Sequence, residues 1–114
     1  MKAKWRASAA AAARAKIAHG RRSAEILRHG SLEVRWYAPK AHDPQAPHER
    51  DEIYVVASGT GLFHRGPEKI RFGPNDLLFV PAGMEHRFED FSDDFAAWVV
   101  FWGPQGGERD NPFA

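Results

Sequence analysis

A histidine and a glutamate stand four positions apart in PHERDEIYVV, residues 47–56, just ahead of an apolar run. The chain of 114 residues has no cysteine, so imidazole nitrogen and carboxylate oxygen are the donors it can offer a divalent metal. On one continuous strand His48 and Glu52 would lie about 13 Å apart, too far to share an ion. The polar residues 49–51 permit a turn. The pair can therefore bind one metal only if the chain bends there.

A third donor, His86, follows a Pro-Ala-Gly turn in PAGMEHRFED. Side chains alternate along a strand, so His86 shares a face with Phe88 and points inward if Phe88 does. The same alternation places Tyr54 on the face of Glu52. Tyr54 and Phe88 are candidates for lining a small-molecule pocket, with an ordinary core position as the alternative. His64 is a further pocket candidate, or an ordinary strand residue.

Short runs rich in β-branched and aromatic residues follow one another from residue 31 onward, separated by glycine, proline, asparagine or aspartate. The predicted strands cover residues 32–37, 52–57, 62–65, 70–72, 77–80, 86–90 and 96–102. Turn-forming residues at intervals of about eight to twelve positions are typical of an all-β sandwich or barrel. In the first strand Leu32, Val34 and Trp36 alternate with Glu33, Arg35 and Tyr37, which indicates a half-buried strand.

Basic residues are concentrated at the N-terminus. Residues 1–30 carry eight Lys and Arg against Glu25 alone, about +7, and the remainder carries about −6. An alanine-rich run predicts a helix that ends at Gly20, and Ser23 and Gly30 predict the cap and end of a second, short helix. We interpret the segment as a solvated helical arm, because no element that could read nucleic-acid bases is visible.

The length predicts one domain, divided into a basic Ala-rich helical arm at 1–30, a β-barrel at 31–105 and a loose tail at 106–114. The absence of cysteine suits a reducing cytoplasm. No segment approaches the roughly 20 apolar residues of a membrane span, and charged residues interrupt the N-terminal alanine run as they would not in a signal peptide. We therefore predict a cytoplasmic protein without a membrane partner and with no nucleic-acid partner.

The segment from 46 to 90 resembles the two motifs of the cupins. The first motif runs H-x-H, three or four residues, E, six residues, G, and the second runs G, five residues, P-x-G-x-x-H, three residues, N. The chain reads APHERDEIYVVASG and NDLLFVPAGMEHRFED, which match at His48, Glu52, Gly59, Pro81, Gly83 and His86. Asn75 stands at the second motif's opening glycine and Asp90 at its closing asparagine.

The resemblance implies a cupin-type jelly-roll β-barrel, usually a homodimer, with a divalent metal held by His48, Glu52 and His86. Ala46 occupies the place of the first motif histidine, so one usual ligand is absent. His42, His64 or water could supply the fourth. Two histidines and one carboxylate suit iron with open positions, and the same donors suit zinc, nickel or manganese.

Two functions stay open at this level. In the first, the protein is a metal-dependent enzyme of oxygenase or isomerase type, which binds a small oxygen-bearing metabolite at the ion and uses Glu52 to move protons. In the second, it is a non-catalytic cupin that binds or senses a small molecule and has a degenerate metal site. The missing ligand at Ala46 motivates the second hypothesis.

Overall fold

The computed structural model describes residues 5–110, 112 and 113; Lys2 and Lys4 of the basic segment lie outside this range. In the described part of the chain, one short helix precedes eight strands. They are α1 (Ala9–Ala13), β1 (Ala24–His29), β2 (Leu32–Tyr37), β3 (Asp51–Ser58), β4 (Gly61–Arg65), β5 (Glu68–Phe72), β6 (Leu77–Val80), β7 (His86–Glu89) and β8 (Ala96–Trp102). Among these residues no helix is long and apolar enough to cross a membrane.

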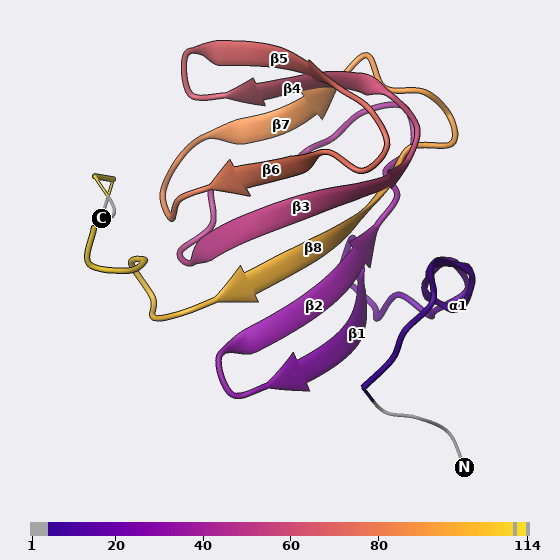
Figure 1. Ribbon diagram of the computed structural model, residues 1–114, viewed down its shortest axis with the longest axis horizontal. Helices are drawn as coiled ribbons and strands as arrows, with labels where there is room; N and C mark the ends of the chain where they lie inside the picture. Colours follow the sequence, from indigo (N-terminus) through magenta and orange to yellow (C-terminus); the bar gives the residue numbers. More distant parts are fainter. Residues whose placement is uncertain (1–4, 111, 114) are drawn as a thin grey trace.

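The strands form two antiparallel sheets, which confirms the predicted all-β jelly roll (Figure 1). The larger sheet has the order β1-β2-β8-β3-β6 and the smaller one the order β5-β4-β7. The main core draws on both sheets, so it lies between them. Its buried residues include Tyr54, Val56 and Val99 from the larger sheet and Phe63, Phe72 and Phe88 from the smaller one.

The more buried face of β2 is the polar one. Strands β2 and β8 have the predicted bounds, and β3 is one residue longer at each end than predicted. Two rows of paired residues cross β2, β8 and β3: Glu33–Phe101–Glu52 and Arg35–Val99–Tyr54. Paired residues share a face of a sheet, so Glu33 and Arg35 face inward with Glu52 and Tyr54. The interior of the larger sheet therefore carries charge as well as apolar surface.

The second predicted helix, with Ser23 as its cap and Gly30 just past its end, is wrong. Residues 24–29 form β1, which pairs with β2 through a two-residue turn of Gly30 and Ser31. Gly30 has φ +57°, the left-handed conformation that such hairpin turns require. Ser23 caps no helix; its Oγ accepts a hydrogen bond from Arg35 Nε at 2.6 Å. Pairing with β2 satisfies backbone groups that an isolated short helix would leave to water.

The alanine-rich helix is shorter than predicted. It starts at the cap residue Ser8, whose side chain accepts from the Ala11 backbone, and covers Ala9–Ala13 instead of continuing to Gly20. Short helices are marginal without tertiary packing, and in α1 only Ala12 is buried. Ala12 belongs to a second small cluster with Ala24, Trp36 and Ala96. In Figure 1 the helix accordingly lies beside the β1–β2 end of the larger sheet.

The segment that begins at residue 106, predicted to be loose, is tied to the start of β3. The Gly106 backbone N–H donates to the Glu49 carbonyl oxygen at 2.6 Å, and the Glu108 N–H donates to Asp51 Oδ2 at 3.0 Å. The other carboxylate oxygen of Asp51 accepts from the Ala82 N–H at 3.0 Å. Asp51 is buried, so its two oxygens join three separate segments next to Glu52.

Several turns of the motif region adopt left-handed backbone conformations, among them those at Gly59, Asn75 and Asp90. Gly59 has φ +86°, and a Cβ there would lie 2.5 Å from Phe95 Cα. Asn75 and Asp90, the two departures from the second cupin motif, have φ of +74° and +49°. Asparagine and aspartate tolerate this conformation better than other non-glycine residues. The departures therefore preserve the turns.

Gly59→Ala should destabilise the protein more than Gly20→Ala. Both positions have positive φ, +86° and +79°, so each alanine incurs the left-handed penalty of roughly 1–2 kcal/mol. Only at Gly59 does the added Cβ meet neighbouring backbone; around Gly20 no atom lies within 4 Å. We expect an additional loss of about 1–3 kcal/mol at Gly59. Urea unfolding of the two variants measures the difference, and equal losses would contradict the predicted clash.

Candidate metal centre

His48, Glu52 and His86 come together, as their spacing predicts. Each offers a ligand atom, and the three atoms lie within 4.8 Å of one another. The chain bends at residues 49 and 50, just before β3, and this brings His48 Nε2 to 3.7 Å from Glu52 Oε1. His86 opens β7 of the smaller sheet, and its Nε2 lies 3.2 Å from the same oxygen. The cluster therefore bridges the two sheets.

Glu52 Oε1 is a buried polar atom with no good hydrogen bond. Its side chain is 1% exposed, and within the described residues Oε1 has no hydrogen-bond partner, although an imidazole nitrogen of each histidine faces it at 3.2 and 3.7 Å. Burying such an oxygen unpaired costs several kcal/mol. Two donors bound at about 2.1 Å to one ion lie roughly 3–4 Å apart. The spacing around Oε1 therefore suits a shared metal ion.

The second ring nitrogen of His86 fixes its tautomer. Nδ1 lies 3.0 Å from the Met84 carbonyl oxygen, which can only accept, so Nδ1 carries a hydrogen. Nε2 is directed at Glu52 and at the Tyr54 hydroxyl, 3.1 Å away. Burial is the largest single effect and lowers the pKa of His86, but the Glu52 carboxylate, the Met84 carbonyl and the charge of Asp43 together raise it, so the net pKa is above its usual value. Once Nε2 loses its proton, it is positioned to bind a metal.

His48 completes the cluster from the solvent side. Its side chain is 34% exposed, and its ring packs edge-on against Phe101 with centroids 5.1 Å apart. Burial lowers the pKa of His48, and the charge of Glu52 offsets part of that shift. A lowered pKa favours the neutral imidazole, which is the form that binds metals.

Gln45 is a site residue that the motif spacing missed, because it lies one position before Ala46, where the motif has histidine. Its amide Nε2 donates to Asp43 Oδ2 at 2.7 Å, which turns Oε1 toward the cluster. That oxygen accepts from the Tyr54 hydroxyl at 2.7 Å and lies 3.2 Å from His48 Nε2. A fixed amide oxygen therefore stands beside His48 in a chain that lacks the usual fourth ligand.

The remaining predicted residues fall in different places. Tyr54 is fully buried with its hydroxyl at the cluster, and burial, followed by the charge of Glu52, raises its pKa well above the usual value. Phe88 is a core residue that packs against aromatic neighbours from both sheets. His64 lies on the opposite face of β4 from buried Phe63, with Nδ1 2.9 Å from Glu89 Oε1. The structure does not bring His64 to the cluster.

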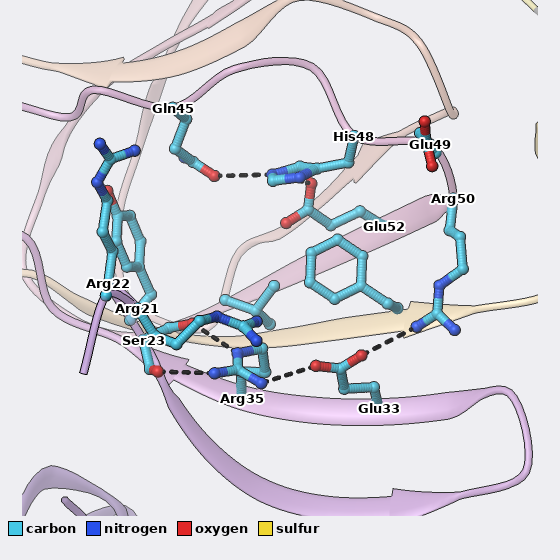
Figure 2. Close-up of a pocket in the computed structure, with 14 residues that line it drawn as sticks. Arg21, Arg22, Ser23, Glu33, Arg35, Gln45, His48, Glu49, Arg50 and Glu52 are labelled. Carbon is cyan, nitrogen blue, oxygen red and sulfur yellow. Dashed lines mark hydrogen bonds and ion pairs between the residues drawn. The ribbon is translucent and has the colours of Figure 1, made fainter. Parts of the chain in front are cut away.

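The fourth-ligand candidate His42 is exposed and likewise lies outside the cluster. The cluster instead opens into a pocket of about 540 Å³ on the inner face of the larger sheet (Figure 2). The pocket is lined by His48, Glu52 and Gln45, and by the inward-facing side chains of β2 and β8. The lining also includes four arginines: Arg21, Arg22, Arg35 and Arg50. A ligand in this pocket would meet both the cluster and guanidinium groups.

Comparisons with known proteins agree with this architecture. An uncharacterized protein of Streptomyces coelicolor is 36% identical over 83 residues, 71% of this chain and 79% of that protein. Acireductone dioxygenase 1 of Coprinopsis cinerea is 49% identical over 47 residues, 36% of this chain and 26% of that enzyme. A solved cupin 2 conserved barrel domain protein from Salinispora arenicola aligns with a TM-score of 0.65 at 19% identity, covering 90% of this chain and 89% of that one. The family model for the cupin domain matches residues 34–102, and the chain therefore belongs to the cupin domain family.

Proposed function

We propose that His48, Glu52 and His86 bind a divalent metal ion that in turn binds a small oxygen-bearing metabolite. The observation that carries this proposal is Glu52 Oε1, buried without a hydrogen bond and faced by two imidazole nitrogens at 3.2 and 3.7 Å. Nitrogen and carboxylate donors in this ratio suit iron, zinc, nickel or manganese. The metal would compensate the buried charge of Glu52.

Gln45 Oε1 is our candidate for the fourth protein donor. This oxygen accepts from the Tyr54 hydroxyl and lies 3.2 Å from His48 Nε2. A metal on His48 Nε2 would require that nitrogen to carry no proton, and the Gln45 oxygen beside it would then be available as a further donor. Asp43 keeps the amide in the required orientation through its contact at 2.7 Å.

The bound ion would supply Lewis acidity or, if it is iron, a place to bind dioxygen. The protein's own residues would hold the ligand in the pocket beside His48 and accept or donate a proton. His86 Nε2 and Glu52 Oε1 lie 3.2 Å apart without forming a hydrogen bond, and these are the two groups that would release a proton on metal binding or pass one to a ligand. The likeness of 36% of this chain to part of a dioxygenase supports a reaction of oxygenase type, with an isomerase as the alternative. Glu52 is our candidate for its proton carrier.

A non-catalytic binding protein is the second candidate. Ala46 removes one usual ligand, and the His86–Glu52 pair already compensates part of the buried charge without a metal. In that case the pocket would bind its metabolite in the presence of a chelator, and added metal would leave the melting temperature unchanged. Homodimer formation and a cytoplasmic location stay predictions for either function.

His48→Ala should abolish metal binding, whereas His64→Ala should not. The two histidines are matched in partial exposure, at 34% and 23% of the side chain, and each faces one carboxylate, but only His48 belongs to the cluster. Elemental analysis of protein purified without a metal-affinity column should give about one ion per chain for wild type and His64→Ala. Saturating metal at about 100 times Kd should stabilise those two proteins by about 2.7 kcal/mol.

His86→Gln serves as a second test of the cluster, because glutamine partly fills the buried site and still removes the imidazole. It should also lose the metal. Unchanged stoichiometry in both His48→Ala and His86→Gln would reject the proposed metal site.

Gln45→Ala should weaken metal binding by about tenfold or more, since partners next to a metal site typically contribute 10–100-fold in affinity. The other glutamine, Gln105, contacts Glu49 outside the cluster, so Gln105→Ala is the control. Competition titrations against a chelating dye measure both dissociation constants. Equal affinities for the two variants would show that the Gln45 oxygen takes no part in metal binding.

A further inference from the structure

The pocket beside the cluster carries an excess of positive charge. Its lining has four arginines against three glutamates, Glu33, Glu49 and Glu52, which leaves +1 before any metal is counted. Glu33 is already shared among three guanidinium groups at 2.7–3.3 Å, and Glu49 accepts from Gln105. A divalent ion at Glu52 would make the excess larger. An anionic ligand is the simplest compensation for this charge.

Arg35 fixes the segment that brings the excess charge to the pocket. Its guanidinium is 4% exposed, and it donates to Ser23 Oγ at 2.6 Å and to the Ser23 carbonyl oxygen at 2.8 Å. Its third contact is with Glu33 at 2.7 Å. Arg35 therefore has its donors engaged by protein groups. Its role is to position Ser23, and with it Arg21 and Arg22, at the pocket wall (Figure 2).

Arg21 and Arg22 differ from Arg35 because their guanidinium groups are largely unengaged. Within the described residues, the Arg21 guanidinium has no hydrogen bond or ion pair, and that of Arg22 has one contact, with the Pro44 carbonyl oxygen at 3.3 Å. Both side chains line the pocket that holds His48 and Glu52. Guanidinium groups bind carboxylates and phosphates through paired, charge-assisted hydrogen bonds.

We propose that the pocket binds a small organic anion whose carboxylate or phosphate group is held by Arg21 and Arg22 while another oxygen of the same molecule faces the metal cluster. This inference rests on the proposed metal-dependent function and names its substrate class. A pocket of about 540 Å³ falls within the usual range for small-molecule sites. Two recognition points, guanidinium and metal, would fix both ends of the ligand.

A nucleic acid is the other anion that the basic N-terminal segment could attract. The arginines in question, however, line a pocket together with a buried carboxylate and an imidazole, and a polymer backbone would have to enter that pocket to reach the cluster. Because Arg21 and Arg22 line the same pocket as Glu52 and His48, their placement favours a small ligand.

The test is a calorimetric titration of the full chain, Zn²⁺-loaded and metal-free, with succinate and with inorganic phosphate. Arg21→Gln/Arg22→Gln should weaken binding of at least one probe by about tenfold or more, the effect of losing a charged hydrogen bond. Lys69→Gln/Arg71→Gln removes the same charge from exposed positions on β5 and should have little effect. The stronger probe decides between carboxylate and phosphate.

Arg21→Lys/Arg22→Lys keeps the charge but loses the paired geometry, so it should bind with intermediate affinity. If circular dichroism shows that the glutamine double variant fails to fold, the lysine double variant provides the test in its place. Equal weakening by the pocket and β5 double variants, or wild-type affinity in the pocket double variant, would overturn the inference. So would the absence of binding of both probes to the wild type, or tight, strongly salt-dependent binding of random-sequence duplex DNA in their place.

Zinc content measured on each preparation separates the two proposals. Full zinc occupancy with anion binding that does not depend on Arg21 and Arg22 would reject the anion site and leave the metal site standing. Anion binding that depends on the two arginines in a chain that takes up neither zinc nor iron, nickel or manganese would reject the metal-dependent function and support the anion site.

Discussion

The buried carboxylate of Glu52 is the constraint around which the interior is organised. A charge in this position requires compensation, and the fold provides it by bringing two imidazoles to the same carboxylate oxygen, at 3.2 and 3.7 Å. His86 belongs to the smaller sheet and Glu52 to the larger one, so the two sheets must close at this end. Asp51, which precedes Glu52 in the chain, accepts hydrogen bonds from the 81–83 turn and from the C-terminal segment, and so holds both next to Glu52.

The interior is divided into an apolar part and a polar part. Phe63, Phe72, Phe88 and Phe95 fill the space between the sheets with tilted and edge-to-face ring contacts, and they exclude water from one side of the cluster. On the other side, Tyr54, Gln45 and Asp43 form a chain of hydrogen bonds that ends at the Tyr37 hydroxyl. The apolar part supplies stability, and the polar part leaves room for a ligand.

Motif spacing predicted the cluster because sequence separation fixes which strand ends carry His48, Glu52 and His86. Alternation predicted β2 and β8 but not that the polar face of β2 is the buried one, since a period of two does not distinguish inside from outside. Strand β1 was missed because a serine and a glycine at 23 and 30 serve equally as helix caps and as hairpin residues. Gln45 escaped notice because its contacts depend on how the irregular loop folds.

The buried pair of Glu33 and Arg35 is best understood through position rather than stability. A buried ion pair gains little net free energy over apolar residues of similar volume, because desolvation offsets the attraction. Arg35 nevertheless holds Ser23 through two hydrogen bonds, and so anchors the segment that leads into β1. The basic N-terminal segment is therefore part of the folded domain. Its residues Arg21 and Arg22 line the same pocket as Glu52.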